Sequence, residues 1–213
     1  MEIYLDRIKT EERYKVFMGL VVPRPIAFVS TRGPDGRFNA APFSFFNIMC
    51  GNPATIVIGI NHRPGGKKDT YLNVEATGEF VVNVVSGRIA EAMNRCSAES
   101  PSDIDEFDLS GLTPAPSVMV GAPRVKEAPA HLECKLSQLV SISEVHKLII
   151  ANIVHVQAED GIVGPTYRID QERLDAVGRM GGDIYTRTNK ELFVMKRPDT
   201  DAVLAEYVKR TKS

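Results

Sequence analysis

The chain has 213 residues, of which 43% are hydrophobic and 25% charged, and this composition suits one globular domain with its own core. A formal net charge of −1 gives no reason to expect nucleic acid or an anionic membrane as a partner. The apolar runs are too short to cross a bilayer, and the charged start does not resemble a signal peptide. We therefore expect a cytoplasmic protein without a membrane span.

The first predicted elements are strands. Residues 26–32, IAFVSTR, are rich in β-branched side chains, and GPDGR at 33–37 has the residues of a tight turn. Residues 38–48 are expected to return antiparallel. Pro42 cannot donate to a ladder, so it places this segment at a sheet edge or bulge. The apolar run at 54–60 predicts an interior strand.

A polar loop with glycines follows at residues 61–70. Asp69 or Thr70 is expected to cap a short helix over 71–77, because both side chains can accept a hydrogen bond from a free backbone N–H. Residues 79–85, EFVVNVV, predict the next strand. The loop therefore connects two strands through one helical turn or more.

The middle of the chain predicts one helix, one excursion and two long strands. Ser86 is expected to cap a helix over 87–98. The acidic, proline-containing segment 99–117 indicates a long surface loop. Residues 131–142 and 147–158 are two long apolar segments joined by a short connection, which is typical of a hairpin.

The last part of the chain is predicted to hold two helices, one over residues 170–179 and one near 200–210. In total, about six strands follow one another as hairpins, with three or four helices that do not alternate with them. This order predicts a closed or sandwiched antiparallel sheet with peripheral helices, and it argues against a doubly wound parallel sheet.

Familiar catalytic and metal-binding patterns are absent from the sequence. There is no glycine-rich nucleotide fingerprint, no HExxH and no GxSxG. The three cysteines are far apart, which favours free thiols in a reducing compartment. No two of the four histidines have the i, i+4 spacing of a helical metal site. We therefore expect no metal.

The loop HRPGGKKDT is a candidate anion site. Its glycines free the backbone to turn N–H groups toward a ligand, and Arg63, Lys67 and Lys68 add positive charge. Thr70 and the start of the following helix add further donors. The alternative is an ordinary solvated loop, and the residues alone do not decide between the two.

Four polar residues, Ser30, Thr31, Asn39 and Ser44, lie on or beside the first predicted hairpin. Buried hydroxyl and amide groups need hydrogen-bond partners. They can satisfy one another within the hairpin, or they can face a planar ligand that lies against a neighbouring ring such as Phe43. Both interpretations stay open at this point.

The segment GRMGGDIYTR at 178–187 has adjacent glycines, a tyrosine and two arginines. Glycine pairs are typical of a helix end followed by a turn. The same residues could form a lid over a ligand, with Tyr185 as the ring that closes it.

Several long strings occur together in one order: RPIAFVSTRGPDGRFNAAPFSFF, NPATIVIGI, KKDTYLNVEATGEFVVNVV, DEFDLSGLTPAPS, HLECKL and GGDIYTR. In this the chain resembles the flavin reductase-like family, the FMN-binding split barrels that include flavoredoxin and the reductase components of two-component monooxygenases. The resemblance covers roughly residues 15–187.

The resemblance implies an antiparallel split β-barrel of Greek-key type with peripheral helices. Residues 1–213 would form a single domain, with its core at about 15–187 and a C-terminal helix within about 188–213. It also implies a homodimer with noncovalent FMN near the dimer interface. Because a flavin carries its own redox chemistry, the absence of an obvious catalyst in the first hairpin is then expected.

The resemblance also implies the residues that contact FMN. The small and hydroxyl residues of the first hairpin would line the ring system and the ribityl chain, the KDT string would lie near the phosphate, and a tyrosine would close the site. The implied residues are Ser30, Thr31, Asn39, Ala40, Ala41, Pro42, Phe43, Ser44, Arg63, Lys68, Asp69, Thr70, Asn73, Asn83 and Tyr185.

The expected reaction is hydride transfer from NAD(P)H to FMN, with the reduced flavin serving a partner oxygenase or another acceptor. Many family members carry Gly-Asp-His where this chain has Glu144, Val145 and His146, and that histidine is associated with the nicotinamide donor. His146 is thus the implied catalytic residue. The alternatives are a flavoredoxin-like electron carrier that is fed by a protein, and a flavin-binding module without enzymatic activity.

Overall fold

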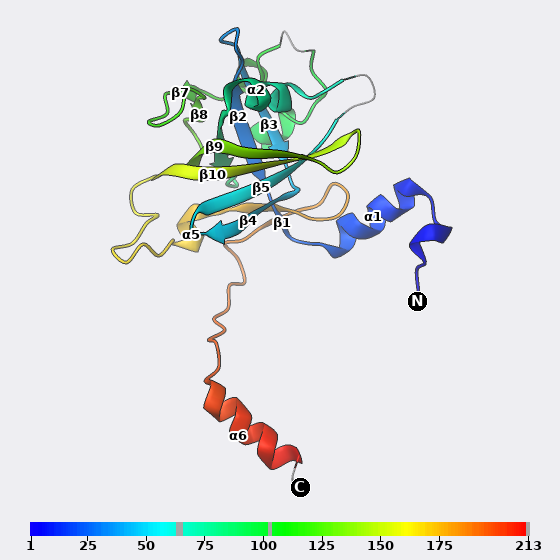
Figure 1. Cartoon of the computed structure of the whole chain (residues 1–213). Coiled ribbons are helices and arrows are strands. Elements are labelled where there is room, and N and C mark those ends of the chain that lie inside the picture. Colours follow the sequence, from blue (N-terminus) through cyan, green and yellow to red (C-terminus); the bar gives the residue numbers. More distant parts are fainter. Residues whose placement is uncertain (63–65, 102–103, 212–213) are drawn as a thin grey trace.

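The computed structural model describes residues 1–62, 66–101 and 104–211. Seven antiparallel strands form the main sheet in the order β3-β2-β6-β9-β10-β5-β4 (Figure 1). Their bounds are β2 Ala27–Arg32, β3 Phe38–Phe43, β4 Phe46–Gly51, β5 Ala54–Asn61, β6 Glu79–Val84, β9 Ala130–Ser141 and β10 His146–Ala158. The predicted antiparallel β architecture is confirmed.

Two smaller sheets complete the β structure. One has the strand order β1-β11-β12, with β1 at Arg24–Pro25, β11 at Val177–Arg179 and β12 at Tyr185–Arg187. The other is a short ribbon of β7, Pro114–Ala115, and β8, Arg124–Val125. The first of these sheets brings residues near 24 and 180 together, since Arg24 pairs with Arg179.

The main sheet closes on itself. Strands β3 and β4 lie at its opposite edges, yet only Ser44 and Phe45 separate them in the chain. The sheet must therefore curl until the two edges meet, and we call the junction at Ser44 and Phe45 the seam. The N–H of Gly59 on β5 donates to the Phe45 carbonyl at 2.7 Å. A Cβ at position 59 would lie 2.9 Å from the Phe45 Cβ, so this close approach requires glycine.

The core lies on both sides of the sheet. Inside the barrel, Ile56, Ile58 and Ile60 of β5 alternate with partly exposed residues and are 0% exposed. On the outer side, Phe28 of β2 packs into a second cluster with Phe107. Burial of large apolar side chains at this level contributes about 1.5–3 kcal/mol each, so both clusters stabilise the sheet.

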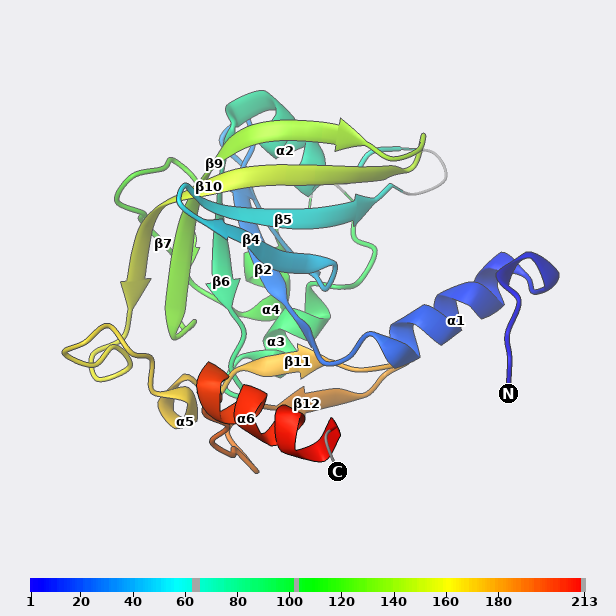
Figure 2. The same ribbon diagram turned by 60° about the horizontal axis from the view of Figure 1, so that its bottom comes forward.

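The helices are peripheral. They are α1 Thr10–Leu20, α2 Asp69–Thr77, α3 Ala90–Arg95, α4 Glu106–Ser110, α5 Gln171–Leu174 and α6 Thr200–Thr211, with a 3-10 turn at Leu5–Arg7. Helix α2 covers one end of the barrel, and its Tyr71 and Val74 join the inner core. Helix α1 projects from the body (Figures 1 and 2), and Figure 1 shows α6 standing away from it. In the described ranges, no helix is long and apolar enough to cross a membrane.

Several local predictions are corrected by tertiary structure. Residues 38–48 do not form one strand, because the chain leaves β3 after Phe43 and starts β4 at Phe46. The expected position of Pro42 at a sheet edge is confirmed, since β3 is an edge strand. The predicted cap of α2 is wrong: Asp69 is already helical, and the N-terminal cap is Lys68 without a side-chain hydrogen bond.

Two predicted helices differ from those in the structure. Ser86 forms a bridge to Ala176, and the helix expected at 87–98 begins only at Ala90. The helix expected over 170–179 ends after α5, because Asp175 has a φ of 47° and the chain then pairs with β1 as β11. The segment 99–117 is not only a surface loop, since it contains α4. The C-terminal helix is confirmed as α6.

Candidate functional site

The polar residues of the first hairpin divide between opposite faces of β2. Ser30 and Thr31 are neighbours on this strand, so their side chains point to different sides. The Ser30 hydroxyl donates to the Pro123 carbonyl at 2.5 Å and accepts from Asn83 Nδ2 at 2.9 Å. Ser30, Thr31 and Asn83 are all 0% exposed and have hydrogen-bond partners inside the protein, and their contact with a ligand stays a prediction.

Asn83 makes a full set of hydrogen bonds inside the protein. Its Nδ2 also donates to the Phe28 carbonyl at 2.9 Å, and its Oδ1 accepts from the Val125 N–H at 2.8 Å. The Nδ1 of His131 lies 3.0 Å from the same Oδ1. Burial lowers the pKa of His131 to about 4, so the ring is neutral at pH 7 and Nδ1 carries the proton. These residues fasten the 123–125 segment to the sheet.

Asn39 is the centre of a second cluster, the Asn39 cluster, which also contains Thr31, Thr70, Asn73 and Glu106. Asn39 Nδ2 donates to Glu106 Oε2 at 2.9 Å, and its Oδ1 accepts from Thr70 Oγ1 at 2.7 Å. Asn73 Nδ2 donates to Thr31 Oγ1 at 2.9 Å. The cluster thus joins β2, β3, α2 and α4, and its hydroxyl and amide groups satisfy one another.

Glu106 holds the free edge of β3. Its Oε2 accepts a second hydrogen bond, from the Ala40 N–H at 3.2 Å, and the residue is 8% exposed. Burial raises the pKa of Glu106, against the lowering effect of its hydrogen bonds from Ala40 and Asn39, and Asp69 adds to the rise. A buried carboxylate therefore positions the strand that leads into the seam.

A small polar pocket of about 180 Å³ adjoins the Asn39 cluster. It is lined by Asp35, Arg37, Phe38, Asn39, Asp69, Asn73, Ile104 and Glu106. Arg37 pairs with Asp35 at 2.6 Å, which leaves a predominantly acidic lining. Such a pocket disfavours a phosphate. Asp69 and Asn73 line this pocket and do not line the larger cavity described next, and their contact with FMN stays a prediction.

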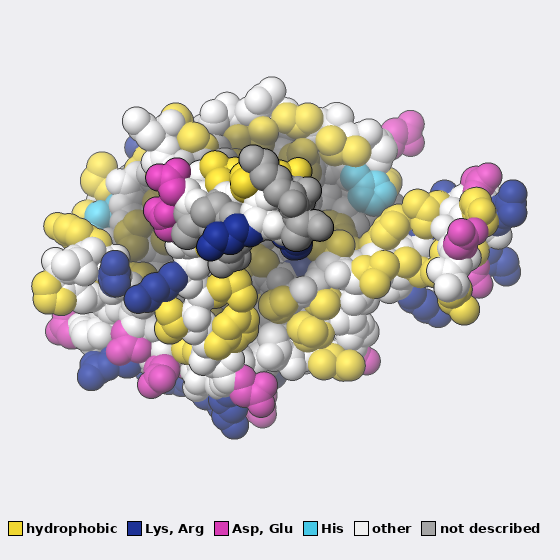
Figure 3. Space-filling view, turned by 90° about the horizontal axis from the view of Figure 1, so that it is seen from below, with side chains coloured by type: hydrophobic (Ala, Val, Ile, Leu, Met, Phe, Trp, Pro, Cys, Tyr) yellow, Lys and Arg dark blue, Asp and Glu magenta, His cyan; other side chains and the backbone are white. Residues whose placement is uncertain are grey.

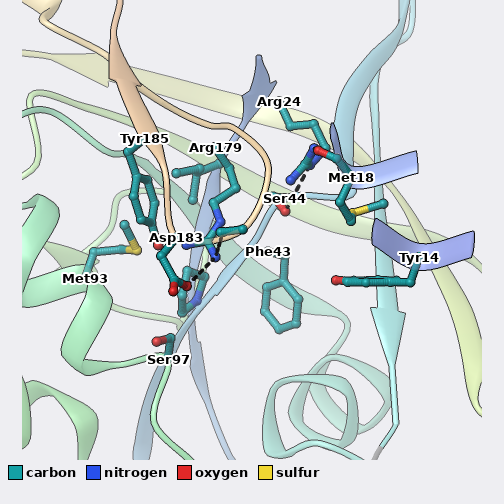
Figure 4. A pocket seen from close by; sticks show the side chains of 13 residues that line it. Tyr14, Met18, Arg24, Phe43, Ser44, Met93, Ser97, Arg179, Asp183 and Tyr185 are labelled. Carbon is teal, nitrogen blue, oxygen red and sulfur yellow. Dashed lines mark hydrogen bonds and ion pairs between the residues drawn. The ribbon is translucent and has the colours of Figure 1, made fainter. Parts of the chain in front are cut away.

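A larger cavity of about 370 Å³ opens at the seam, and we call it the seam cavity (Figure 4). It is lined by Tyr14, Met18, Arg24, Ile26, Pro42, Phe43, Ser44, Met93, Ser97, Arg179, Gly182, Asp183 and Tyr185. The structure thus brings together four of the predicted residues: Pro42, Phe43, Ser44 and Tyr185. Ala40 and Ala41 do not line it, because they pack against the two cores.

The lining of the seam cavity is aromatic and polarisable. The rings of Tyr14, Phe43 and Tyr185 and the thioether of Met93 surround the space in Figure 4. Its volume lies at the lower end of the ~300–1,000 Å³ that is usual for ligand sites. Flat aromatic ligands pack well against such rings. The side chains present therefore fit the ring system of a flavin.

Arg24 holds the wall of the cavity together. Its Nη1 donates to the carbonyls of Met18 and Val21, both at 2.8 Å, and its Nη2 donates to the Met180 carbonyl at 2.9 Å. Its Nε lies 3.5 Å from Ser44 Oγ. The residue is 7% exposed. Arg24 thus connects the end of α1, the β11–β12 hairpin and the seam, and its donors are used within the protein.

Arg179 is the second arginine of the lining. Its guanidinium lies 4.4 Å from the centroid of the Tyr185 ring and donates to the Gly182 carbonyl at 2.5 Å. Asp183 Oδ1 is 3.7 Å from its Nη2 (Figure 4). The Tyr185 hydroxyl in turn donates to Asn94 at 3.2 Å. The hairpin therefore presents one aromatic ring, one cation and one carboxylate to the cavity.

Lys68 lies close to the seam from another direction. Its Nζ is 5.4 Å from the centroid of the Phe43 ring, and Phe43 lines the cavity. Lys67 is paired with Glu75 at 2.8 Å. Arg63, the third predicted cation of this loop, lies outside the described residues. Lys68 is thus the cation of the predicted loop that the structure places beside the seam.

His146 does not line the seam cavity. It is exposed at the first position of β10, and its Nδ1 is 2.9 Å from Ser143 Oγ. The register of the sheet pairs it with Asn61 of β5. Its role toward a nicotinamide donor stays a prediction.

Sequence reasoning missed Tyr14, Met18, Arg24, Arg179 and Glu106. The hydrogen-bond partners of Arg24 and Glu106 are remote in sequence: Arg24 donates to the Met180 carbonyl, and Glu106 accepts from Asn39. No local sequence pattern predicts such contacts. Arg179 lies in the segment 178–187, which was considered as a lid. The glycine pair close to an arginine was the sequence feature that could have indicated it. Among the described residues, no group of three or more His, Cys, Asp or Glu side chains is arranged to hold a metal ion.

Comparison with known proteins agrees with this geometry. A model of the family described as "Flavin reductase like domain" matches residues 18–176. An uncharacterised protein from Aquifex aeolicus is 40% identical over 188 residues, covering 88% of this chain and 95% of its own length.

Two solved structures are similar over nearly their whole length. Nitrilotriacetate monooxygenase component B from Bacillus cereus has a TM-score of 0.86 and 30% identity, covering 91% of this chain and 98% of its own. A Shewanella frigidimarina protein described as having a split barrel domain has a TM-score of 0.82 and 25% identity, covering 92% of this chain and all of its own. The chain is a split barrel and belongs to the flavin reductase like domain family.

Proposed function

We propose that the chain is an FMN-binding oxidoreductase that takes a hydride from NAD(P)H. The observation that supports it best is the seam cavity, which offers aromatic rings and a cation but no nucleophile with an adjacent base. When bound, FMN supplies the redox chemistry, and the protein has to bind, orient and shield it. Hydride transfer depends mainly on the distance and orientation of donor and acceptor, so a site without a triad suits it.

The residues of this chain would divide the work of binding. Phe43, Tyr14 and Tyr185 would pack against the planar ring system, and Pro42 and Ser44 would limit how it enters. Lys68 would supply charge to the phosphate, because its ammonium group lies beside Phe43, which lines the seam cavity. This lysine supports a phosphorylated flavin over riboflavin, and FMN is proposed among phosphorylated flavins on the family resemblance.

We propose a homodimer because apolar side chains lie exposed along α1. This helix buries none of its residues in the described chain, and Tyr14 and Leu20 are 54% and 76% exposed. On β4, Ile48 is 63% exposed. Figure 3 shows apolar side chains on the projecting arm and on the face beside it. Patches of this kind mark contact surfaces. A second copy would cover them and complete the cavity wall that α1 begins.

A partner oxygenase is proposed as the acceptor of reduced flavin, on the similarity to a monooxygenase component B. The three free cysteines support a reducing compartment such as the cytoplasm. The position of His146 outside the cavity favours a second candidate, an FMN electron carrier that receives electrons from a protein.

The test is an absorbance spectrum of the purified protein, followed by anaerobic addition of NADH or NADPH in a stopped-flow instrument. A flavin spectrum that bleaches on the timescale of turnover supports the reductase. A flavin that stays oxidised with both nucleotides, but is reduced by a protein donor, supports the carrier. A protein that carries no flavin and takes up none from added FMN contradicts both.

A further inference from the structure

Arg179 and Asp183 form an ion pair on the wall of the seam cavity, next to Tyr185 (Figure 4). They are four residues apart across the turn of the β11–β12 hairpin, where Gly182 has a φ of 59°. The turn is held close to α1, since a Cβ at Gly181 would lie 3.2 Å from the Gly19 Cα. The pair therefore has a defined place beside the proposed flavin.

Of the two arginines in the lining, Arg179 is the one with donors to offer. The donors of Arg24 go to three backbone carbonyls and to Ser44. In the described part of the chain, the hydrogen bond of Arg179 goes to the Gly182 carbonyl. A guanidinium presents five N–H groups in a fixed fork, and Arg179 lines the cavity, so it has donors left for a ligand there.

The pairing with Asp183 is weak. The N–O distance is 3.7 Å, and the side chain of Asp183 is fully exposed while that of Arg179 is 27% exposed. Exposed ion pairs contribute between zero and about 1 kcal/mol. The Tyr185 ring and the Gly182 carbonyl hold the guanidinium whether or not Asp183 is present. An anion of a ligand can therefore replace the carboxylate at little cost.

We infer that Arg179 binds the anionic group of the second ligand, the one that exchanges electrons with the flavin, and that Asp183 competes with this anion for the guanidinium. The inference rests on the proposed function. The ligand class is a small or nucleotide-like molecule with a carboxylate or a phosphate, since a planar guanidinium binds either group through two parallel hydrogen bonds. The flavin phosphate is assigned to Lys68, whose ammonium group lies beside Phe43.

The Arg179–Asp183 pair can be tested because substitutions of its two members should change the affinity for an anion in opposite directions. Arg179→Gln removes the charge and keeps N–H donors, whereas Asp183→Asn removes the competing charge and keeps the size. Arg173→Gln is the matched control, because Arg173 forms an exposed pair with Asp170 at 3.4 Å elsewhere on the surface. Calorimetry on the FMN-loaded protein would measure binding of benzoate and its neutral analogue benzamide, and of ADP and adenosine.

We expect the native protein to prefer the anion of at least one pair. Arg179→Gln should reduce that preference about tenfold, and Asp183→Asn should increase it a few-fold, with Arg173→Gln unchanged. The inference is overturned if the native protein and Arg179→Gln prefer the anion over its neutral analogue equally. It is also overturned if Asp183→Asn reduces this preference. A preference for benzoate over benzamide would indicate a carboxylate ligand. A preference for ADP over adenosine would indicate a phosphate ligand.

Two further measurements separate this inference from its foundation. If Arg179→Gln weakens FMN but not riboflavin, the anion on Arg179 is the flavin phosphate, and the inference is wrong although the proposed function stands. If the native protein binds no FMN, the proposed function fails, and the inference fails with it. Circular dichroism and urea unfolding show whether each variant is folded before any titration is interpreted.

Discussion

Asn39 Nδ2 lies 2.9 Å from Glu106 Oε2, although 67 positions separate the two residues in the chain. The same carboxylate oxygen accepts from the Ala40 N–H, so one side chain of α4 satisfies two donors of β3. Strand β3 leads directly into Pro42, Phe43 and the seam cavity. The position of this strand therefore depends on a residue that does not itself line the cavity.

Replacing Glu106 by alanine should leave both donors buried without a partner. We expect a loss of about 2–4 kcal/mol in the free energy of unfolding, together with weaker FMN binding. Glu106→Gln should lose less, because its carbonyl oxygen can occupy the Oε2 position. Urea unfolding and FMN fluorescence titration check this. Asp108→Ala, on the exposed face of α4, is the control, and an alanine variant at 106 as stable as this control would contradict the prediction.

The carboxyl of Glu106 should also leave a signature in the pH dependence of stability. Burial raises its pKa above the ordinary value of 4.5, so the folded protein binds this proton more readily than the unfolded chain. The stabilisation that the protonated Glu106 carboxyl gives the folded state is therefore fully present below the pKa of the unfolded chain. It is lost as the pH rises through the raised pKa of the folded protein. We expect the stability of the native protein relative to Glu106→Gln to fall as the pH rises above the ordinary value of 4.5. A constant difference would show that Glu106 titrates normally.

His131 should have the opposite dependence. Its pKa is depressed from 6.5 to about 4 by burial, so between these values the unfolded chain binds a proton and the folded protein does not. The contribution of neutral His131 to the free energy of unfolding is complete above pH 6.5. It is lost as the pH falls toward 4, by about 3 kcal/mol in all. Urea unfolding across this range should show a shallower slope for His131→Gln. Equal slopes would mean that other groups cause the acid sensitivity.

Lys68→Ala should weaken FMN binding about tenfold by removing one charge near the phosphate, with riboflavin binding unchanged. Lys67→Ala is the matched control, because Lys67 is engaged with Glu75. Fluorescence quenching of both flavins measures the effect. Unchanged FMN affinity in Lys68→Ala would remove the phosphate role from this lysine.

His146→Ala should raise the KM for the nicotinamide donor and leave the Kd of FMN as it is. Loss of one hydrogen bond worth about 1.4 kcal/mol corresponds to about a tenfold change. The residue lies outside the seam cavity of its own chain, so the effect would have to come from a donor that extends beyond the cavity or from a second copy. Steady-state kinetics with NADH and NADPH decide, and identical constants would exclude His146 from this role.

The strands were predictable from the sequence because their signal is local. IAFVSTR and ATIVIGI are rich in β-branched residues, and they form β2 and β5 almost to the residue. Residues 170–179 show the limit of this approach. Asp170 caps a short helix as its sequence suggests, but pairing of Arg179 with Arg24 on β1 then determines a strand. Local preference is overridden where a distant partner is available.

The candidate site was predictable only in part, for a similar reason. The segment Pro42 to Ser44 and Tyr185 were identified, and the structure joins them in one cavity. Ser30 and Asn83 are residue types that often contact ligands. In the structure their side chains hydrogen-bond to each other, and the sequence alone does not show which face of the sheet each side chain occupies. Glu106 lies in an acidic segment that is typical of a solvated loop, and only the fold shows that it is buried.

The seam also determines what a single break in the chain would do. Ser44 and Phe45 keep the two edge strands of a seven-stranded sheet beside each other. Cleavage of the bond between them would leave every strand intact but let the two edge strands move apart, so that both edges become accessible. Free strand edges pair readily with other chains. A nick at this one position should therefore turn a discrete protein into a template for aggregation, and a ligand seated across the seam would protect against it.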